Sequence, residues 1–101
     1  MARIKLEVIS WLTRAFSSKE SSRLVLEEAV EAGNTVRDLF DRLAAENPVF
    51  AEYVFNREKQ EITGHVSVIF NDRILELLDG LDTEVKDGDT VTLLPAFSGG
   101  S

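Results

Sequence analysis

The feature that most constrains the fold is one clearly delimited helix pattern within an otherwise strand-like chain. Thr35 is a favourable N-cap, and Asp38 three residues later completes a capping box. Pro48 ends the helix near Glu46, because the residue before a proline avoids helical geometry. The apolar positions between these limits form a single stripe at helical spacing: Val36, Leu39, Phe40, Leu43 and Ala44. Such a stripe must be buried against another element, so the rest of the chain has to supply a sheet.

Two segments before the helix show the alternation of strands that bury one face. Residues 4–9 direct every second apolar side chain to one side, and Ile9 falls on the otherwise polar side. Residues 24–30 predict a second strand. The segment 11–22 between them ends in a polar, Ser-rich stretch, residues 16–22, which indicates a loop. We therefore expect a hairpin with a long connection.

The pattern after the helix is more varied. Residues 49–62 are ambiguous: helical spacing at their start is compatible with a short helix, and the charged run 57–61 predicts a mobile loop. Residues 65–70 alternate like a strand, with Ser67 and Ile69 outward. Residues 90–94 predict the last strand, which ends at a proline because proline has no N–H for a sheet ladder.

Length and order together predict an α+β architecture with one core. A chain of 101 residues supports one domain, which we assign to residues 1–95. Residues 96–101 form a short polar and glycine-containing end, for which we expect a flexible tail.

Composition limits the classes of function. The chain has no Cys, which excludes disulfides, thiolate metal sites and cysteine nucleophiles. The net charge of −7 argues against a nucleic-acid binder, which would present a basic face. No apolar run approaches the ~20 residues that span a bilayer, and the first residues lack the apolar region of a signal peptide. We expect a cytoplasmic protein without a membrane or nucleic-acid partner.

No group of side chains predicts catalysis or metal binding. His65 is the single histidine, and nothing in the sequence fixes a nucleophile beside it, so we interpret it as structural. The acidic residues between positions 79 and 89 do not keep the register of a calcium loop, and acidic turns explain them better. We expect no catalytic residues, no metal and no bound cofactor.

Two glycines near the chain end, Gly99 and Gly100, have an ordinary explanation as a linker or an expression remnant. The surrounding residues change that interpretation. The segments Val68–Asp72 and Val85–Gly100 resemble the closing third of the β-grasp sulfur carriers. That family includes the small subunit of molybdopterin synthase, the carriers of thiamine and cysteine biosynthesis, and the archaeal small modifiers. Its pattern is an acidic Asp-Gly-Asp turn, an apolar strand, a proline and a short linker into Gly-Gly.

The chain departs from the pattern at three positions. Ala96 stands where many molybdopterin-type carriers have a second proline, and Phe97 stands where valine is usual. Ser101 follows Gly100, whereas the chemistry of the family needs a terminal glycine carboxylate. Ser101 is therefore a residue removed by a processing protease, an expression remnant, or a sign that the tail is not used in this way.

The resemblance implies a β-grasp fold: a mixed sheet, one main helix on one face and a Gly-Gly tail. It further implies that an ATP-dependent adenylating enzyme activates the Gly100 carboxylate, with Gly99 beside it, and that a sulfur donor converts it into a thiocarboxylate. The chain would be a carrier and substrate, at most the small subunit of a synthase with a large partner subunit, and not an enzyme. ATP would be used by the activating enzyme.

Two alternatives stay open. In one, the chain is a ubiquitin-like modifier joined through Gly100 to lysines of target proteins; in the other, it is an interaction domain whose glycines have no chemistry. Relatives also dock through an apolar patch on the open sheet face. The positions that match this partner interface are Ile9, Leu78 and Leu94, with Phe97 in the tail.

Overall fold

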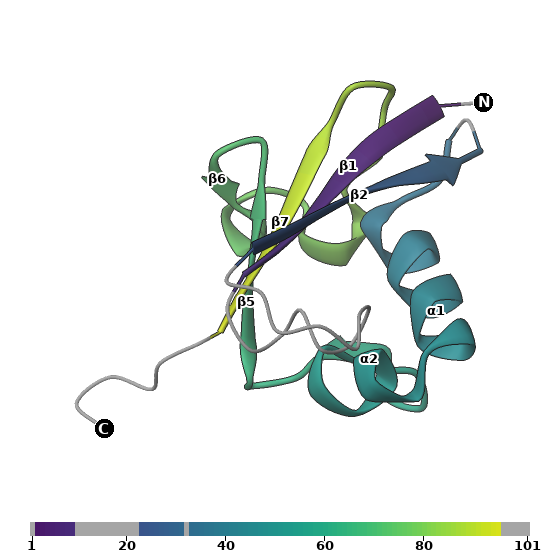
Figure 1. Cartoon of the computed structure of the whole chain (residues 1–101), viewed down its shortest axis with the longest axis vertical. Helices are drawn as coiled ribbons and strands as arrows, with labels where there is room; N and C mark the ends of the chain where they lie inside the picture. The colour runs from purple at the N-terminus through teal and green to yellow at the C-terminus, as the bar shows by residue number, and fades with distance from the viewer. Residues whose placement is uncertain (1, 10–22, 32, 96–101) are drawn as a thin grey trace.

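The computed structural model describes residues 2–9, 23–31 and 33–95 of the chain (Figure 1). The buried apolar residues form one core, which includes residues from the first strand to the last. The elements, in chain order, are β1 (Ala2–Ile9), β2 (Arg23–Val30), α1 (Val36–Glu46), α2 (Pro48–Tyr53), β3 (Phe55–Asn56), β4 (Glu61–Ile62), β5 (Val66–Phe70), β6 (Arg73–Ile74), the 3-10 turns η2 (Leu75–Leu77) and η3 (Gly80–Asp82), and β7 (Thr90–Pro95).

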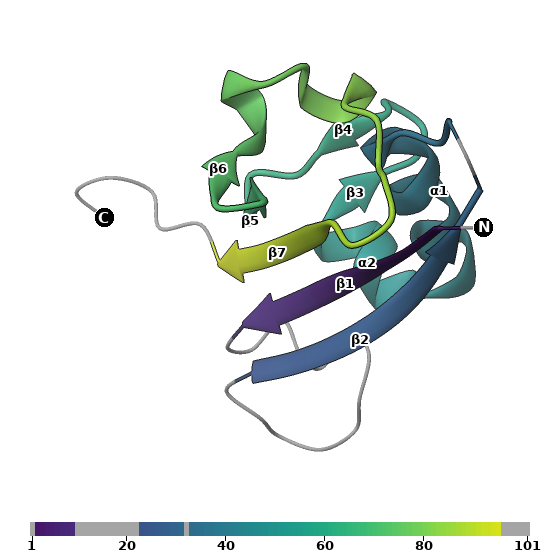
Figure 2. The same cartoon turned by 90° about the horizontal axis from the view of Figure 1, so that it is seen from above.

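The main sheet has the strand order β2-β1-β7-β5-β6. β7, the last strand in sequence, lies in the middle, parallel to β1 and antiparallel to β5. The two helices pack on one side of this sheet, and no helix of the described residues covers the other side, which we call the open face (Figure 2). The predicted α+β architecture with a mixed sheet and one main helix is therefore confirmed.

The helix α1 begins and ends where the sequence predicts. The Asp38 N–H donates to Thr35 Oγ1 at 3.3 Å, and the Thr35 N–H donates back to Asp38 Oδ2 at 2.9 Å. These two bonds satisfy donors that the first turn leaves without a partner. All five residues of the predicted apolar stripe are buried. The capping box thus sets the start of the helix, and the stripe fixes the face it turns to the sheet.

The ambiguous segment after α1 forms a second, shorter helix. Asn47 caps α2 by accepting the N–H groups of Val49 and Phe50 at 3.1 and 3.3 Å. Phe50 then reaches Phe40 of α1, with ring centroids 5.4 Å apart in an edge-on arrangement. Phe55 contacts the same ring at 6.0 Å. This aromatic cluster explains why a short helix is stable here, because edge-on ring pairs stabilise beyond their buried area.

The charged run 57–61, expected as a mobile loop, has more structure than its composition indicates. This segment is the turn of a small hairpin in which β3 pairs with β4. The Arg57 Nε donates to Asp41 of α1 at 3.0 Å, and the Gln60 amide donates to the same carboxylate at 3.2 Å. Polar composition alone does not show that these charged side chains have a partner on the helix.

A polar clamp positions the central strand β7. The Asp89 carboxylate accepts the Lys86 N–H at 2.7 Å and the Asn71 side-chain amide at 2.9 Å. Asn71 in turn accepts the Thr90 N–H at 2.8 Å. Gly88 has a φ of 87°, a left-handed conformation that strongly favours glycine. These contacts agree with the interpretation of the acidic segment as turns.

The described residues contain no helix with the length and apolar character needed to cross a bilayer.

Candidate functional site

The candidate site consists of the end of β7 and the open face of the main sheet. Pro95 is the last described residue, and it closes the strand that lies between β1 and β5. The predicted tail positions Phe97, Gly99, Gly100 and Ser101 follow it and lie outside the described residues. The structure describes the surface that precedes the tail, namely the end of β7 and the sheet around it.

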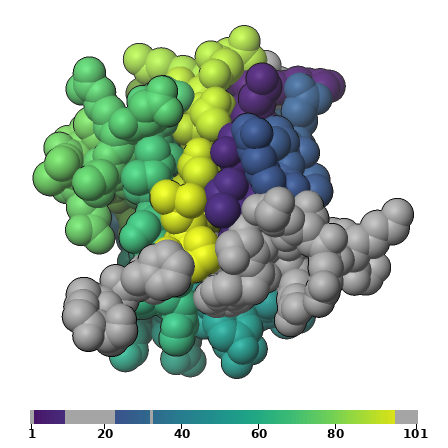
Figure 3. All heavy atoms as spheres, turned by 60° about the vertical axis from the view of Figure 1, so that its left-hand side comes forward, coloured from purple at the N-terminus to yellow at the C-terminus, as the bar shows by residue number. Residues whose placement is uncertain are grey.

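Figure 3 looks onto the open face, where β7 runs down the middle with β1 on one side and β5 on the other. Val8 pairs with Leu93 in the parallel ladder, and both are buried on the helix side. Ile9 and Leu94 come one residue later on the same two neighbouring strands. Because side chains alternate along a strand, both turn to the open face, where each is half-buried. Two of the predicted interface residues are therefore neighbours beside the point where the chain leaves the sheet.

Two further apolar residues, which the sequence did not predict for the interface, enlarge this patch. Ile69 of β5 pairs with Ile74 of β6, and it also lies opposite Thr92 of β7. Ile69 is half-buried, and Ile74 is 51% exposed. The outward position of Ile69 was visible in the alternation of its strand, whereas Ile74 needed the β5–β6 pairing, which the sequence did not predict.

Leu78 does not lie on the open sheet face. It follows η2, outside the strands, where it is half-buried and packs against the core. Its neighbour Leu77 is instead 79% exposed. The difference arises because the chain leaves β6 directly into a 3-10 turn, whose short repeat changes which residue faces solvent. A role of Leu78 in a partner interface remains a prediction.

Charged side chains border the apolar patch. Arg23 of β2 donates to Glu7 of β1 at 2.9 Å, and Arg3 lies 3.8 Å from Glu27 on the same face. On the far side of the molecule, Arg57 holds the pKa of the Asp41 carboxyl below its usual value by hydrogen bonding, assisted by Gln60. A lowered pKa keeps Asp41 ionised, which suits a structural contact rather than proton transfer at neutral pH.

The structure also places the single histidine. His65 is exposed just before β5, and its ring meets the edge of Tyr53 at a centroid distance of 5.7 Å. Within residues 2–9, 23–31 and 33–95, no three His, Asp or Glu side chains come together in a way that could hold a metal ion.

Comparison with known proteins identifies the family of this chain. The ThiS family matches residues 18–100, which is most of the chain. The chain belongs to the ThiS family. Its members are carrier proteins of the ubiquitin-like type, which are substrates of other enzymes and are not enzymes themselves.

Sequence and structure comparisons agree with this assignment. Small archaeal modifier protein 3 of Haloferax volcanii is 37% identical over 71 residues, which cover 70% of this chain and 75% of that protein. The solution structure of the HVO 2177 protein, also from Haloferax volcanii, has a TM-score of 0.74 at 26% identity and covers 98% of this chain and 87% of that one. The β-grasp fold expected from the resemblance is confirmed.

A third similar structure shows a relative together with another protein. The Amycolatopsis orientalis BexX/CysO complex contains a chain that is 27% identical to this ThiS-family protein, with a TM-score of 0.69. The match covers 96% of this chain and 99% of that one. The chain described here is thus a ubiquitin-like carrier or modifier of the ThiS and archaeal modifier type.

Proposed function

We propose that this chain is a sulfur carrier whose reactive group is the carboxylate of Gly100. The observation that carries the proposal is that the ThiS-family match extends to Gly100 and leaves Ser101 beyond its end. A terminal Gly100 carboxylate requires that Ser101 be absent from the working form. We therefore propose that Ser101 is removed by a processing protease or is an expression remnant.

The proposed chemistry has two steps. The Gly100 carboxylate attacks the α-phosphate of ATP on an adenylating enzyme, which forms an acyl adenylate and releases pyrophosphate. Hydrosulfide then attacks the acyl carbon, the bond to AMP breaks, and a thiocarboxylate remains. The activating enzyme uses the ATP, and the carrier contributes a carboxylate that fits a narrow site. Glycine at positions 99 and 100 suits that task, because without a Cβ the backbone can approach another protein closely.

The geometry of the described residues supports a carrier that presents its carboxylate to a separate activating enzyme. Gly100 lies five residues beyond Pro95, so it can extend at most about 18 Å from the end of β7. The neighbouring patch around Ile9 and Leu94 offers apolar surface beside the exit of the chain. We propose that the adenylating enzyme, and a large synthase subunit where one exists, dock on this patch while the tail, including Phe97, enters their active sites.

The receiving pathway is proposed as cofactor biosynthesis of the molybdopterin type. Support comes from the Asp-Gly-Asp turn and the strand that ends in Pro95, a pattern that the molybdopterin-type carriers share with the rest of the sulfur carriers. A cytoplasmic location accompanies this proposal, since the activating reaction consumes ATP.

A second candidate function is conjugation to lysines of other proteins. The observation that favours it is the 37% identity to small archaeal modifier protein 3. In that case a lysine amine, rather than hydrosulfide, attacks the activated Gly100 and forms an isopeptide bond. Both functions share the first step, so they differ in the acceptor alone.

The shared step is tested by ATP–pyrophosphate exchange with the cognate adenylating enzyme, using chains that end at Gly99, Gly100 and Ser101. We expect exchange with the chain that ends at Gly100 and a loss of at least tenfold with the other two. The melting temperatures of all three should agree, because the three chains differ only beyond Pro95, where β7 ends. Equal exchange by the chain ending at Ser101 would contradict the role of Gly100, and no exchange by any of them would favour a plain interaction domain.

A further inference from the structure

The outer edge of β2 offers a second interaction surface, separate from the open face. β2 is the terminal strand of the sheet, and no strand pairs with its far edge in the part of the chain that the structure describes (Figure 2). With eight residues it is as long as β1, its partner. An edge strand of that length presents a row of backbone donors and acceptors on which another strand can form.

The backbone contacts of β1 show which residues of β2 point outward. The Lys5 N–H donates to the Asp89 carbonyl at 2.9 Å, and the Arg3 carbonyl accepts the Gly88 N–H at 2.9 Å. Odd-numbered residues of β1 therefore turn their peptide groups toward β7 and its preceding turn. The even-numbered residues of β1 bond to β2, where their partners are also even-numbered. The odd-numbered residues of β2 consequently point their peptide groups away from the sheet.

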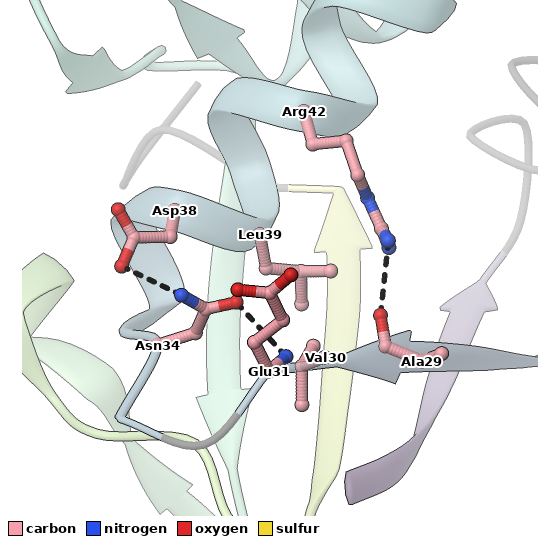
Figure 4. A pocket seen from close by; sticks show the side chains of 7 residues that line it. All are labelled: Ala29, Val30, Glu31, Asn34, Asp38, Leu39 and Arg42. Carbon is pink, nitrogen blue, oxygen red and sulfur yellow. Dashed lines mark hydrogen bonds between the residues drawn. The ribbon is translucent and has the colours of Figure 1, made fainter. Parts of the chain in front are cut away.

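Arg42 of α1 closes one end of this outer edge. Its Nη1 donates to the Ala29 carbonyl at 2.9 Å, and its Nη2 donates to the Glu28 carboxylate at 2.7 Å. Figure 4 shows the side chain reaching from the helix to the strand, above a hollow between α1 and β2. The carbonyl that an added strand would need at Ala29 is already bonded. The edge that remains for pairing runs from the start of β2 to Glu27, and Val25 is at its centre.

We propose that this edge pairs antiparallel with the same edge of a second copy of the chain, with the two-fold axis at Val25. In this register Val25 lies opposite Val25 of the second copy, and Arg23 lies opposite the second copy's Glu27. Leu24 lies opposite the second copy's Leu26. Val25 is 46% exposed in the single chain, so the pairing covers an apolar side chain that β-strands favour.

The charges favour this register over those with the axis at Glu27 or at Arg23. A two-fold axis at Glu27 would bring two glutamates directly opposite each other, and an axis at Arg23 would bring two guanidinium groups together. Like charges directly opposite are destabilising, whereas opposite charges stabilise a cross-strand pair. Of the axes at Arg23, Val25 and Glu27, the axis at Val25 is the one that places Arg23 of each copy opposite Glu27 of the other copy.

The pairing leaves the candidate site free. A two-fold axis perpendicular to the sheet keeps both open faces on one side and both helix layers on the other. Ile9 and Leu94 remain accessible on each copy, because the contact uses the strand edge rather than the face. The interface involves few residue pairs, so we expect the dimer to form at high protein concentration and to dissociate on dilution.

The register is tested by disulfide formation between single-cysteine variants. The chain has no Cys, so the introduced residue is the only thiol in each variant. In Val25→Cys the two thiols meet across a hydrogen-bonded pair whose Cα atoms are about 5.5 Å apart, within the range of a disulfide. Ala29→Cys is the matched control on the same strand and face, since the two copies of that residue lie about 26 Å apart in this register. We expect Val25→Cys to cross-link at least tenfold faster in a glutathione buffer. Equal rates, or faster cross-linking of Ala29→Cys, would overturn the proposal.

Sedimentation equilibrium of the native sequence provides the second test. The native chain and Val25→Thr, which keeps a β-branched side chain, should both dimerise. Val25→Lys places two ammonium groups at the axis and should weaken the dimer at least tenfold, while its melting temperature stays close to that of Val25→Thr. A native chain that remains monomeric up to about 1 mM, or a Val25→Lys dimer of unchanged strength, would overturn the proposal. Neither result bears on the activation of Gly100.

Discussion

The two faces of the main sheet carry different side chains, although the same strands build both. The face toward the helices is apolar and shielded from solvent: Leu6, Val91 and Leu93 are fully buried there. The open face combines an ion pair between Arg23 and Glu7 with the half-buried apolar pair Ile9 and Leu94. Because alternate residues of a strand point to opposite faces, one short sequence can specify folding on one face and recognition on the other. Substitutions on the helix-covered face should therefore lower the stability of the fold, whereas substitutions on the open face should lower affinity for a partner.

The largest effect is expected in the aromatic cluster of the core, on the helix side of the main sheet. Phe40→Ala removes the ring that touches both Phe50 and Phe55 and leaves a cavity in the core. The free energy of unfolding should fall by about 3–5 kcal/mol, measured by urea denaturation. Ile74→Ala on the open side is the control, and it should stay within about 0.5 kcal/mol of the native chain. Equal losses for both variants would remove the distinction between the faces.

A change on the open face should affect binding more than folding. Leu94→Glu places a charge in the proposed docking patch, so affinity for the adenylating enzyme should drop by about tenfold or more, or ~1.4 kcal/mol. Isothermal titration calorimetry measures the affinity, and thermal melting monitors the fold. Thr90→Glu is a matched control on the same strand and face, farther from the end of β7. A large loss of melting temperature with Leu94→Glu would instead assign Leu94 to the core.

The helix cap allows a finer test of the covered side. Thr35→Ala removes the side-chain acceptor of the Asp38 N–H and half of the capping box. We expect a loss of about 1 kcal/mol in the free energy of unfolding, with unchanged affinity for the adenylating enzyme. Thr35→Ser keeps the hydroxyl and should restore most of the stability. A loss of affinity in Thr35→Ala would mean that the helix layer contributes to docking.

The smallest expected effect depends on pH. The pKa of Asp41 is lowered, chiefly by its hydrogen bond from Arg57 and also by that from Gln60. The stabilisation is therefore complete above the ordinary aspartate pKa of about 3.9 and is lost as the pH falls through the lowered folded value. Asp41→Asn should melt slightly earlier than the native chain at pH 7, because both partners are partly exposed and solvent screens them. The gap in melting temperature should close in strong acid; a gap that does not change with pH would contradict this cause.

Local signals predicted much of this fold. The capping box and stripe of α1, the alternation of β1 and β5, and the turn at Gly88 all depend on residues close in sequence. Their physical causes act within a few residues, so periodicity and capping chemistry are sufficient. The position of β7 in the middle of the sheet depends instead on its pairing with β1, about 85 residues earlier in the chain. Nothing local marks that pairing.

The features that the sequence did not predict also depend on residues distant in the chain. Polar character suggested a mobile loop at Arg57 and Gln60, but both side chains bind Asp41 on α1. The position of Leu78 on the open face rested on the resemblance alone, and the structure places this residue after a 3-10 turn that instead exposes Leu77. Ile9, by contrast, was found correctly on the open side, since an apolar residue on the polar side of a strand is a local signal. The tail glycines were recognisable from their pattern, whereas the surface that surrounds the exit of the chain required the sheet.

The account depends most on a folded body that presents the Gly100 carboxylate for activation by another enzyme. Intact-mass spectrometry tests this directly, after incubation of the chain ending at Gly100 with the cognate adenylating enzyme, ATP and sulfide. We predict a product in which one oxygen is replaced by sulfur, and its absence when Gly100 is deleted or ATP is omitted. An unchanged mass, with an enzyme that converts its own known carrier in parallel, would contradict the account.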